Sequence, residues 1–148
     1  MNLRYSIANN HYNKYVTKET DTISVLLQDL ATKCMSPVTK YKDKDMADVT
    51  TGKEWISKNH RNNANILERG NLGMIDFEGK KDNLDKLLDA IETHDLWYAA
   101  IPSQSNKTDK KNSRYHIVYL LTKPYSINAE AYKLQAKAFF ESIKYTWN

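Results

Sequence analysis

Residues 72–79, Leu-Gly-Met-Ile-Asp-Phe-Glu-Gly, decide how the rest of the chain is interpreted. Their apolar start and alternating end are typical of a strand, in which side chains two residues apart point to the same face. We therefore expect Ile75 and Phe77 in the core, with Asp76 and Glu78 side by side on the other face. Two neighbouring carboxylates supply the oxygen ligands that Mg²⁺ or Mn²⁺ prefers. The same octamer is also typical of an edge strand that ends in solvated acids before a turn.

The length and composition of the chain indicate one globular domain. It has 148 residues, of which 41% are hydrophobic and 27% charged, and its net charge is +4. This mild basic bias is compatible with a phosphate-bearing partner. No apolar run approaches the roughly 20 residues that a membrane span needs, so no membrane partner is predicted. The single cysteine, Cys34, excludes an internal disulfide and fits a reducing cytoplasm.

Hydrophobic periodicity predicts further elements on both sides of the octamer. Asp82 and Asn128 are expected to cap the helices that they precede, because a short polar side chain can accept a hydrogen bond from the first helical turn. The expected elements are a strand at 3–8, a helix at 22–34, a short strand at 38–41, a helix at 51–59, a helix after residue 82, strands at 96–101 and 114–121, and a final helix after residue 128.

The second half of the chain indicates the fold class. A strand at 72–78, a helix and a strand at 96–101 predict a crossover unit with two parallel strands. We expect an α+β fold in which residues 1–148 form a single domain. Its sheet is predicted to be mostly antiparallel, with one βαβ crossover, strand 72–78 in the middle and the helices on one face.

Basic residues concentrate in segments near the octamer, which suggests contacts with DNA phosphates. Base edges in a groove would be contacted by Gln104, Asn106 or Arg114. Any single lysine in such a polar loop is more typical of a solvated surface than of a DNA contact. The candidate DNA-binding residues are Lys58, Arg61, Lys80, Lys81, Gln104, Asn106, Lys107, Lys110, Lys111 and Arg114.

The order of these parts resembles a known family. The octamer ends in Asp-x-Glu-Gly, and a helix and an apolar strand follow it. A Pro-Ser-x-Ser segment at 102–105, a polar loop, the strand at 114–121, Lys-Pro at 123–124 and a last helix complete the series. Together they resemble the RRM-like palm of the archaeo-eukaryotic primase (primase-polymerase) superfamily, especially its versions in phages, plasmids and satellite elements. The resemblance covers roughly residues 60–148.

The resemblance implies roles for particular residues. Asp76 and Glu78 match the acids that hold catalytic Mg²⁺ or Mn²⁺, which in two-metal chemistry activate the attacking oxygen and stabilise the leaving group. The family's second motif usually supplies a histidine that binds phosphates, but Asn106 stands at the matching position. His116, on the next strand, is the residue that would replace it. The family's third acid follows its last helix, whereas this sequence ends at Asn148.

These departures favour binding over catalysis. We expect the N-terminal DNA-binding domain of a longer replication initiator, which recognises origin duplex in the cytoplasm of a bacterial host cell. A C-terminal helicase domain is the partner that the resemblance implies. One alternative is an active primase-polymerase fragment that uses Asp76, Glu78 and Mg²⁺ or Mn²⁺. The other is a metal-dependent nuclease, because Glu78-Gly79-Lys80 is an acid-x-Lys triplet.

Overall fold

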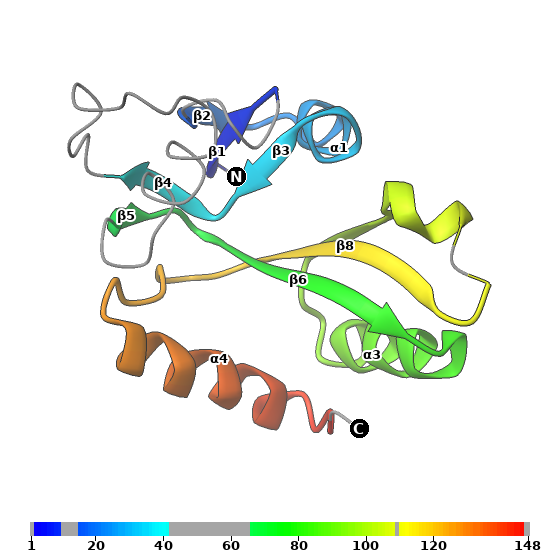
Figure 1. The fold of residues 1–148 in the computed structure, drawn as a ribbon. Coiled ribbons are helices and arrows are strands. Elements are labelled where there is room, and N and C mark those ends of the chain that lie inside the picture. Colours follow the sequence, from blue (N-terminus) through cyan, green and yellow to red (C-terminus); the bar gives the residue numbers. More distant parts are fainter. Residues whose placement is uncertain (1, 10–14, 42–65, 109, 147–148) are drawn as a thin grey trace, which may run out of the picture.

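The computed structural model describes residues 2–9, 15–41, 66–108 and 110–146, in which the strands form three sheets (Figure 1). Every strand pairing in these ranges is antiparallel, and the predicted α+β class is confirmed. The predicted helix at 51–59, together with Lys58 and Arg61, lies outside the described residues. No helix in the described ranges is long and apolar enough to cross a membrane. The elements are β1 (Leu3–Ala8), β2 (Val16–Thr20), α1 (Ile23–Thr32), β3 (Cys34–Ser36), β4 (Val38–Tyr41), β5 (Ile66–Arg69), β6 (Leu72–Gly79), α3 (Lys81–Thr93), β7 (Tyr98–Pro102), the 3₁₀ turn η4 (Gln104–Lys107), β8 (Ser113–Leu120) and α4 (Ala129–Ser142).

The strand that carries the acid pair, β6, lies at an edge of its sheet. The strand order is β6-β8-β7, so β8 and not β6 is in the middle. β6 pairs with β8 along its whole length, from Leu72 opposite Leu120 to Gly79 opposite Ser113. Because β6 and β7 both run antiparallel to β8, they are parallel to each other, but β8 separates them. The prediction of a central strand was therefore wrong, since the periodicity of a strand does not reveal its neighbours.

One face of the β6-β8-β7 sheet packs against α3 and α4. The alternation predicted for β8 is confirmed, because Ile117 and Tyr119 face these helices whereas Val118 faces the other way. Gly73 lies opposite Tyr119 in the register, and the Tyr119 ring fills the space that a Cβ atom at residue 73 would occupy. The buried side chains of this core are Ile75, Phe77, Leu84, Leu87, Ile91, Ile117, Tyr119 and Ile143.

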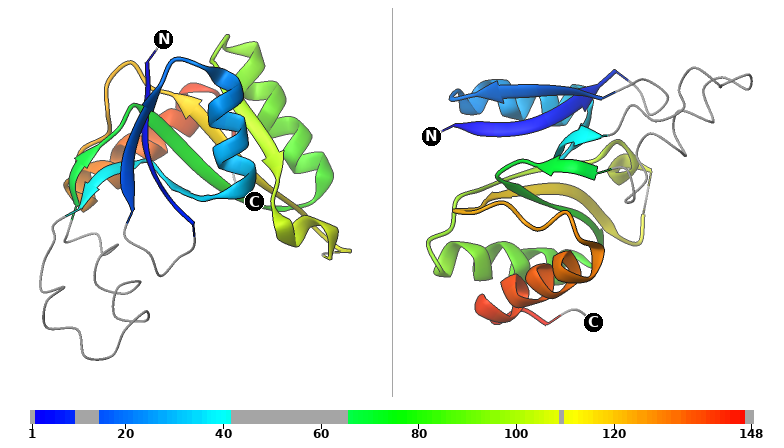
Figure 2. Two further views of the ribbon diagram at one scale, coloured as in Figure 1. Left: turned by 90° about the horizontal axis from the view of Figure 1, so that it is seen from above. Right: turned by 90° about the vertical axis from the view of Figure 1, so that its left-hand side faces the viewer.

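The other face of the same sheet is covered by β1 and α1, so the chain forms three layers (Figure 2). Leu72, Ala99 and Val118 from the sheet meet apolar side chains of β1 and α1 there. Our prediction that the helices lie on one face was wrong for α1. The physical reason is that this second face of the sheet is also apolar and has to be covered.

Helix α1 is shorter than predicted. It ends at Thr32, and Lys33 already has an extended backbone (φ −125°, ψ 163°). Cys34, which the periodicity assigned to the helix, instead begins β3 and lies opposite Ala8 of β1. Pairing with β1 satisfies backbone groups that a longer helix would have bonded internally, so the sheet ends the helix here.

A buried carboxylate attaches α1 to the β1-β2 hairpin. Asp29 is 4% exposed, and it accepts a 2.7 Å hydrogen bond from the Tyr5 hydroxyl. Lys18 Nζ lies 2.6 Å from the same carboxylate. Burial, and then the hydrogen bond to Asp29, raises the pKa of Tyr5 above its ordinary value. The buried charge is therefore paired and hydrogen-bonded, as a charge inside a protein has to be.

The N-terminal end of α4 is fixed by its cap and by β5. The Asn128 side chain accepts a 3.0 Å hydrogen bond from the Ala131 N–H, as predicted. Arg69 Nε donates to the Ser126 carbonyl at 2.9 Å, and its guanidinium lies 4.0 Å from the centre of the Tyr132 ring. In α3, by contrast, Lys80 occupies the cap position and Asp82 lies in the first turn, so the prediction of an Asp82 cap was wrong.

Candidate functional site

Asp76 and Glu78 lie on the face of β6 that α3 and α4 leave open. The register places Asp76 opposite His116 and Glu78 opposite Arg114 on β8. Arg114 Nη2 donates a 2.8 Å hydrogen bond to Glu78 Oε1, and His116 Nδ1 lies 3.0 Å from Asp76 Oδ1. The predicted placement of the two acids on one strand face is thus confirmed, and the structure brings Arg114 and His116 next to them.

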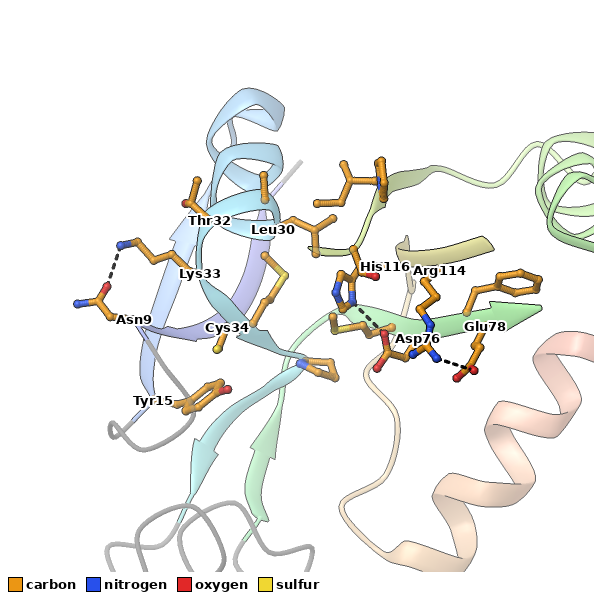
Figure 3. A pocket seen from close by; sticks show the side chains of 18 residues that line it. Asn9, Tyr15, Leu30, Thr32, Lys33, Cys34, Asp76, Glu78, Arg114 and His116 are labelled. Atoms are coloured by element: carbon orange, nitrogen blue, oxygen red, sulfur yellow. Dashed lines mark hydrogen bonds and ion pairs between the residues drawn. The ribbon is translucent and has the colours of Figure 1, made fainter. Parts of the chain in front are cut away.

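These four side chains line a groove of about 770 Å³ between the sheet and the N-terminal part of the chain (Figure 3). The opposite wall is formed by the end of α1 and by β3, with side chains that include Leu30, Lys33, Cys34 and Met35. Met74, Ile101, Pro102 and Ser103 complete the side formed by the sheet. The volume of the groove lies within the range of about 300–1,000 Å³ that is usual for small-molecule pockets.

The charges in the groove largely cancel. Glu78 is paired with Arg114, and Asp76 is in contact with His116, which carries charge only when it is protonated. The His116 Nδ1 atom is buried, and its contact with Asp76 does not have the angles of a hydrogen bond. Lys33, on the opposite wall, donates a 2.9 Å hydrogen bond to Asn9. The groove therefore holds basic groups but has no strong excess of positive charge.

A lysine cluster lies at one end of the groove. The last register pair of β6 and β8 is Gly79 with Ser113, one position beyond Glu78 with Arg114. Lysines follow Gly79 directly and come shortly before Ser113, so the pairing brings both groups to the same end of the sheet (Figure 1). All four side chains are exposed. We call Lys80, Lys81, Lys110 and Lys111 the lysine edge.

The other predicted DNA-contacting residues of this region are Lys107, Asn106 and Gln104, of which the first two differ in exposure and in hydrogen bonding. Lys107 is exposed at the end of η4, next to the lysine edge in sequence. Asn106 Oδ1 accepts a 2.8 Å hydrogen bond from the Arg114 N–H, and the Asn106 N–H donates to the Ser103 carbonyl at 3.0 Å. Asn106 therefore attaches η4 to the start of β8. The side chain of Gln104 lies outside the described part of the structure.

Asp76 and Glu78 are the residues that could hold a divalent cation. Their side chains are 83% and 53% exposed, and each uses one carboxylate oxygen for its basic partner. Within the described ranges, no group of three or more His, Cys, Asp or Glu side chains is arranged as a metal site. Mg²⁺ is commonly held by one or two carboxylates together with water and substrate phosphates. The pair therefore fits a cation that is shared with a phosphate group.

Sequence reasoning missed the wall opposite the acids. Lys33, Cys34 and Met35 are far from residues 72–79 in the chain, and the sequence placed Cys34 on the buried face of a helix. The available signal was Pro37, which marks the end of the helical segment but does not show where β3 will lie. Only the packing of β1 and α1 on the sheet brings this wall to the groove.

Comparison of the chain with protein families, with curated proteins and with solved structures found no match. The arrangement of the groove and the lysine edge is accordingly the basis for a functional assignment.

Proposed function

We propose that this chain is the DNA-binding domain of a replication initiator, built on a primase-polymerase-like palm. DNA lies along the lysine edge, next to the groove that contains Asp76, Glu78, Arg114 and His116. The observation that carries this proposal is the Gly79–Ser113 pairing, because it brings the segments that carry two separate lysine pairs to the same end of the sheet. Arg114 and Lys107 extend that surface toward the groove and along η4.

The charge of this surface supports binding to a polyanion. Lysines that neutralise DNA phosphates release condensed counterions, and this release supplies most of the non-specific affinity of DNA-binding proteins. The four lysines of the lysine edge lie in exposed positions at one end of the β6-β8 pair. An ordinary solvated face does not require lysines from separate segments to lie at the same place. A surface that binds the phosphate backbone of DNA does require this.

The role in initiation rests on the resemblance to the primase-polymerase palm. In that reading the target is origin duplex, a helicase domain belongs to the same longer protein, and the complex works in the cytoplasm of a bacterial host. Sequence choice at the origin requires base contacts in addition to the lysines. Arg114, at the junction of groove and lysine edge, is the candidate for such a contact.

An electrophoretic mobility shift assay tests the assignment. Duplex fragments from the genetic element that encodes the chain are compared with scrambled duplexes of equal length, over a range of salt concentrations. We expect one fragment to bind at least about 1,000-fold more tightly than its scrambled version, as specific DNA-binding proteins do. Equal and steeply salt-dependent binding to all duplexes would contradict origin recognition, and failure to bind any duplex would contradict DNA binding itself.

The exposure of both carboxylates favours a second candidate function, metal-dependent nucleotidyl transfer. Asp76 and Glu78 face the groove together, where Mg²⁺ or Mn²⁺ would assist attack on a nucleotide phosphate. Template-dependent nucleotide incorporation that is lost in Asp76→Asn and Glu78→Gln proteins distinguishes this candidate from binding alone. The nuclease alternative needs an acid upstream of the octamer, and the candidates Asp43, Asp45 and Asp48 lie in a polar stretch of the sequence that predicts no partner strand.

A further inference from the structure

The groove and the lysine edge differ in charge although they adjoin each other. The charged residues that line the groove are Asp76 and Glu78 against Lys33 and Arg114, with His116 as a group that adds charge on protonation. Arg114 is already in contact with Glu78, and His116 with Asp76. A phosphate that entered the groove would meet two carboxylates, whereas the lysine edge carries four exposed lysines at one end of the sheet. Without a cation to bridge them to these carboxylates, phosphates are therefore expected outside the groove.

The walls of the groove are suited to an uncharged, flat group. Met74 lies two residues before Asp76 on the same face of β6, and Ile101 of β7 lies on the other side of β8. Leu30 and Met35, from the N-terminal part of the chain, belong to the same apolar cluster as Met74 and Ile101. Methionine side chains adapt to ring systems and make favourable contacts with them. The groove thus offers an apolar patch, formed by side chains from the sheet and from the N-terminal part of the chain.

Polar atoms at the floor of the groove can recognise such a group by hydrogen bonds. The Asp76 side chain is 83% exposed and that of Glu78 is 53% exposed, so their carboxylates can still accept hydrogen bonds. His116 is 31% exposed and its Nδ1 atom is buried, so the accessible part of the ring is its other edge. Nucleobases present donors and acceptors of this kind on their edges once they are unpaired.

We propose that the groove takes one unpaired base of a DNA strand whose phosphates lie on the lysine edge. This proposal rests on the DNA-binding function proposed above and adds a specific ligand for the groove. A groove of about 770 Å³ has room for a base with its sugar. The base packs on the apolar patch that includes Met74 and Met35, and its edge faces Asp76 and His116.

Binding of single strands with and without bases tests the proposal. A strand of about 12 nucleotides, within the site sizes of single-strand binders, is compared with an abasic strand of equal length that keeps every phosphate. We expect the intact strand to bind at least about fivefold more tightly at a fixed salt concentration, because one stacked base has an effect of this size. The two strands should have the same salt dependence, since their phosphates are the same.

Three single variants show whether the preference for intact strands arises in this groove. Met74→Ala removes an apolar contact of the groove without changing its charge, so it should lower affinity for the intact strand and leave the abasic strand unaffected. Lys110→Ala should weaken both strands by the same factor. Met35→Ala, on the opposite wall, repeats the first measurement should Met74→Ala unfold. A base preference that survives in both methionine variants would overturn the assignment to this groove.

The binding results distinguish failure of the proposed base site from failure of the proposed DNA-binding function. A fully paired duplex of the same sequence is measured alongside the single strands. Equal binding of intact and abasic strands overturns the base site alone, as does binding of the duplex without binding of either single strand. If neither the duplex nor the single strands bind, the proposed DNA-binding function fails as well.

Discussion

Replacing all four residues of the lysine edge by alanine is expected to reduce affinity for duplex DNA by about 100-fold or more at low salt. Each lost phosphate contact lowers the slope of log K against log salt concentration by about 0.9, so four contacts lower it by about 3.6. The variant carries Lys80→Ala, Lys81→Ala, Lys110→Ala and Lys111→Ala, all at exposed positions. A salt titration followed by fluorescence anisotropy measures both quantities.

A matched pair of double variants controls for net charge. Lys110→Ala with Lys111→Ala removes two charges from the lysine edge, and Lys133→Ala with Lys137→Ala removes two from α4, which covers the opposite face of the sheet. Lys133 and Lys137 are 73% and 75% exposed, with acidic neighbours no closer than 3.9 Å. We expect only the first double variant to lower the slope. Similar losses in both would show that binding follows overall charge and not the lysine edge.

Gly73→Ala is expected to destabilise the protein by about 2–3 kcal/mol, because it overpacks the core and breaks a partly buried hydrogen bond. A Cβ atom at residue 73 would lie 2.0 Å from Cζ of the Tyr119 ring. This ring cannot move aside easily, since it stacks on Phe139 at 4.0 Å and its hydroxyl lies 2.9 Å from that of Tyr125. Displacing it would loosen the contact between β8 and α4. Urea denaturation measures the change.

Gly79→Ala serves as the control on the same strand. Its new Cβ would be 3.0 Å from the nearest atom, Cζ at the tip of the Phe77 ring, so a small shift relieves the contact. We expect the free energy of unfolding to change by less than about 1 kcal/mol in this variant. Equal destabilisation by the two substitutions would show that Gly73 is not needed to make room for Tyr119.

Local features of the sequence predicted most of the individual elements. Strict alternation identified β1 and β8, and the octamer at 72–79 corresponds to β6 with its two acids on one face. The Asn128 cap was predicted because its hydrogen bond forms within one turn of the chain. All these features depend on neighbours in sequence, which is the range that periodicity and capping describe.

The order of the strands and the groove could not be predicted in the same way. The sequences of residues 72–79 and 114–121 do not predict that Asp76 lies opposite His116. The reason is that α3 and β7 separate β6 from β8 in the chain, so no tight turn fixes the register of the two strands. The strand that carries the two acids was also predicted to lie in the middle of the sheet, whereas β6 is an edge strand. The far wall of the groove depends on where the N-terminal layer packs, which is a property of the assembled cores.

The most direct test of the account is an NMR titration of the isotope-labelled protein with a short DNA duplex. We predict that the backbone amide resonances of residues 78–83 and 106–116 shift or broaden together, since these segments carry the lysine edge and the adjoining end of the groove. Resonances of α4, residues 129–142, should stay in place. Changes centred on α4, or the absence of any change near residues 78–83 and 106–116 when DNA is bound, would contradict the central claim.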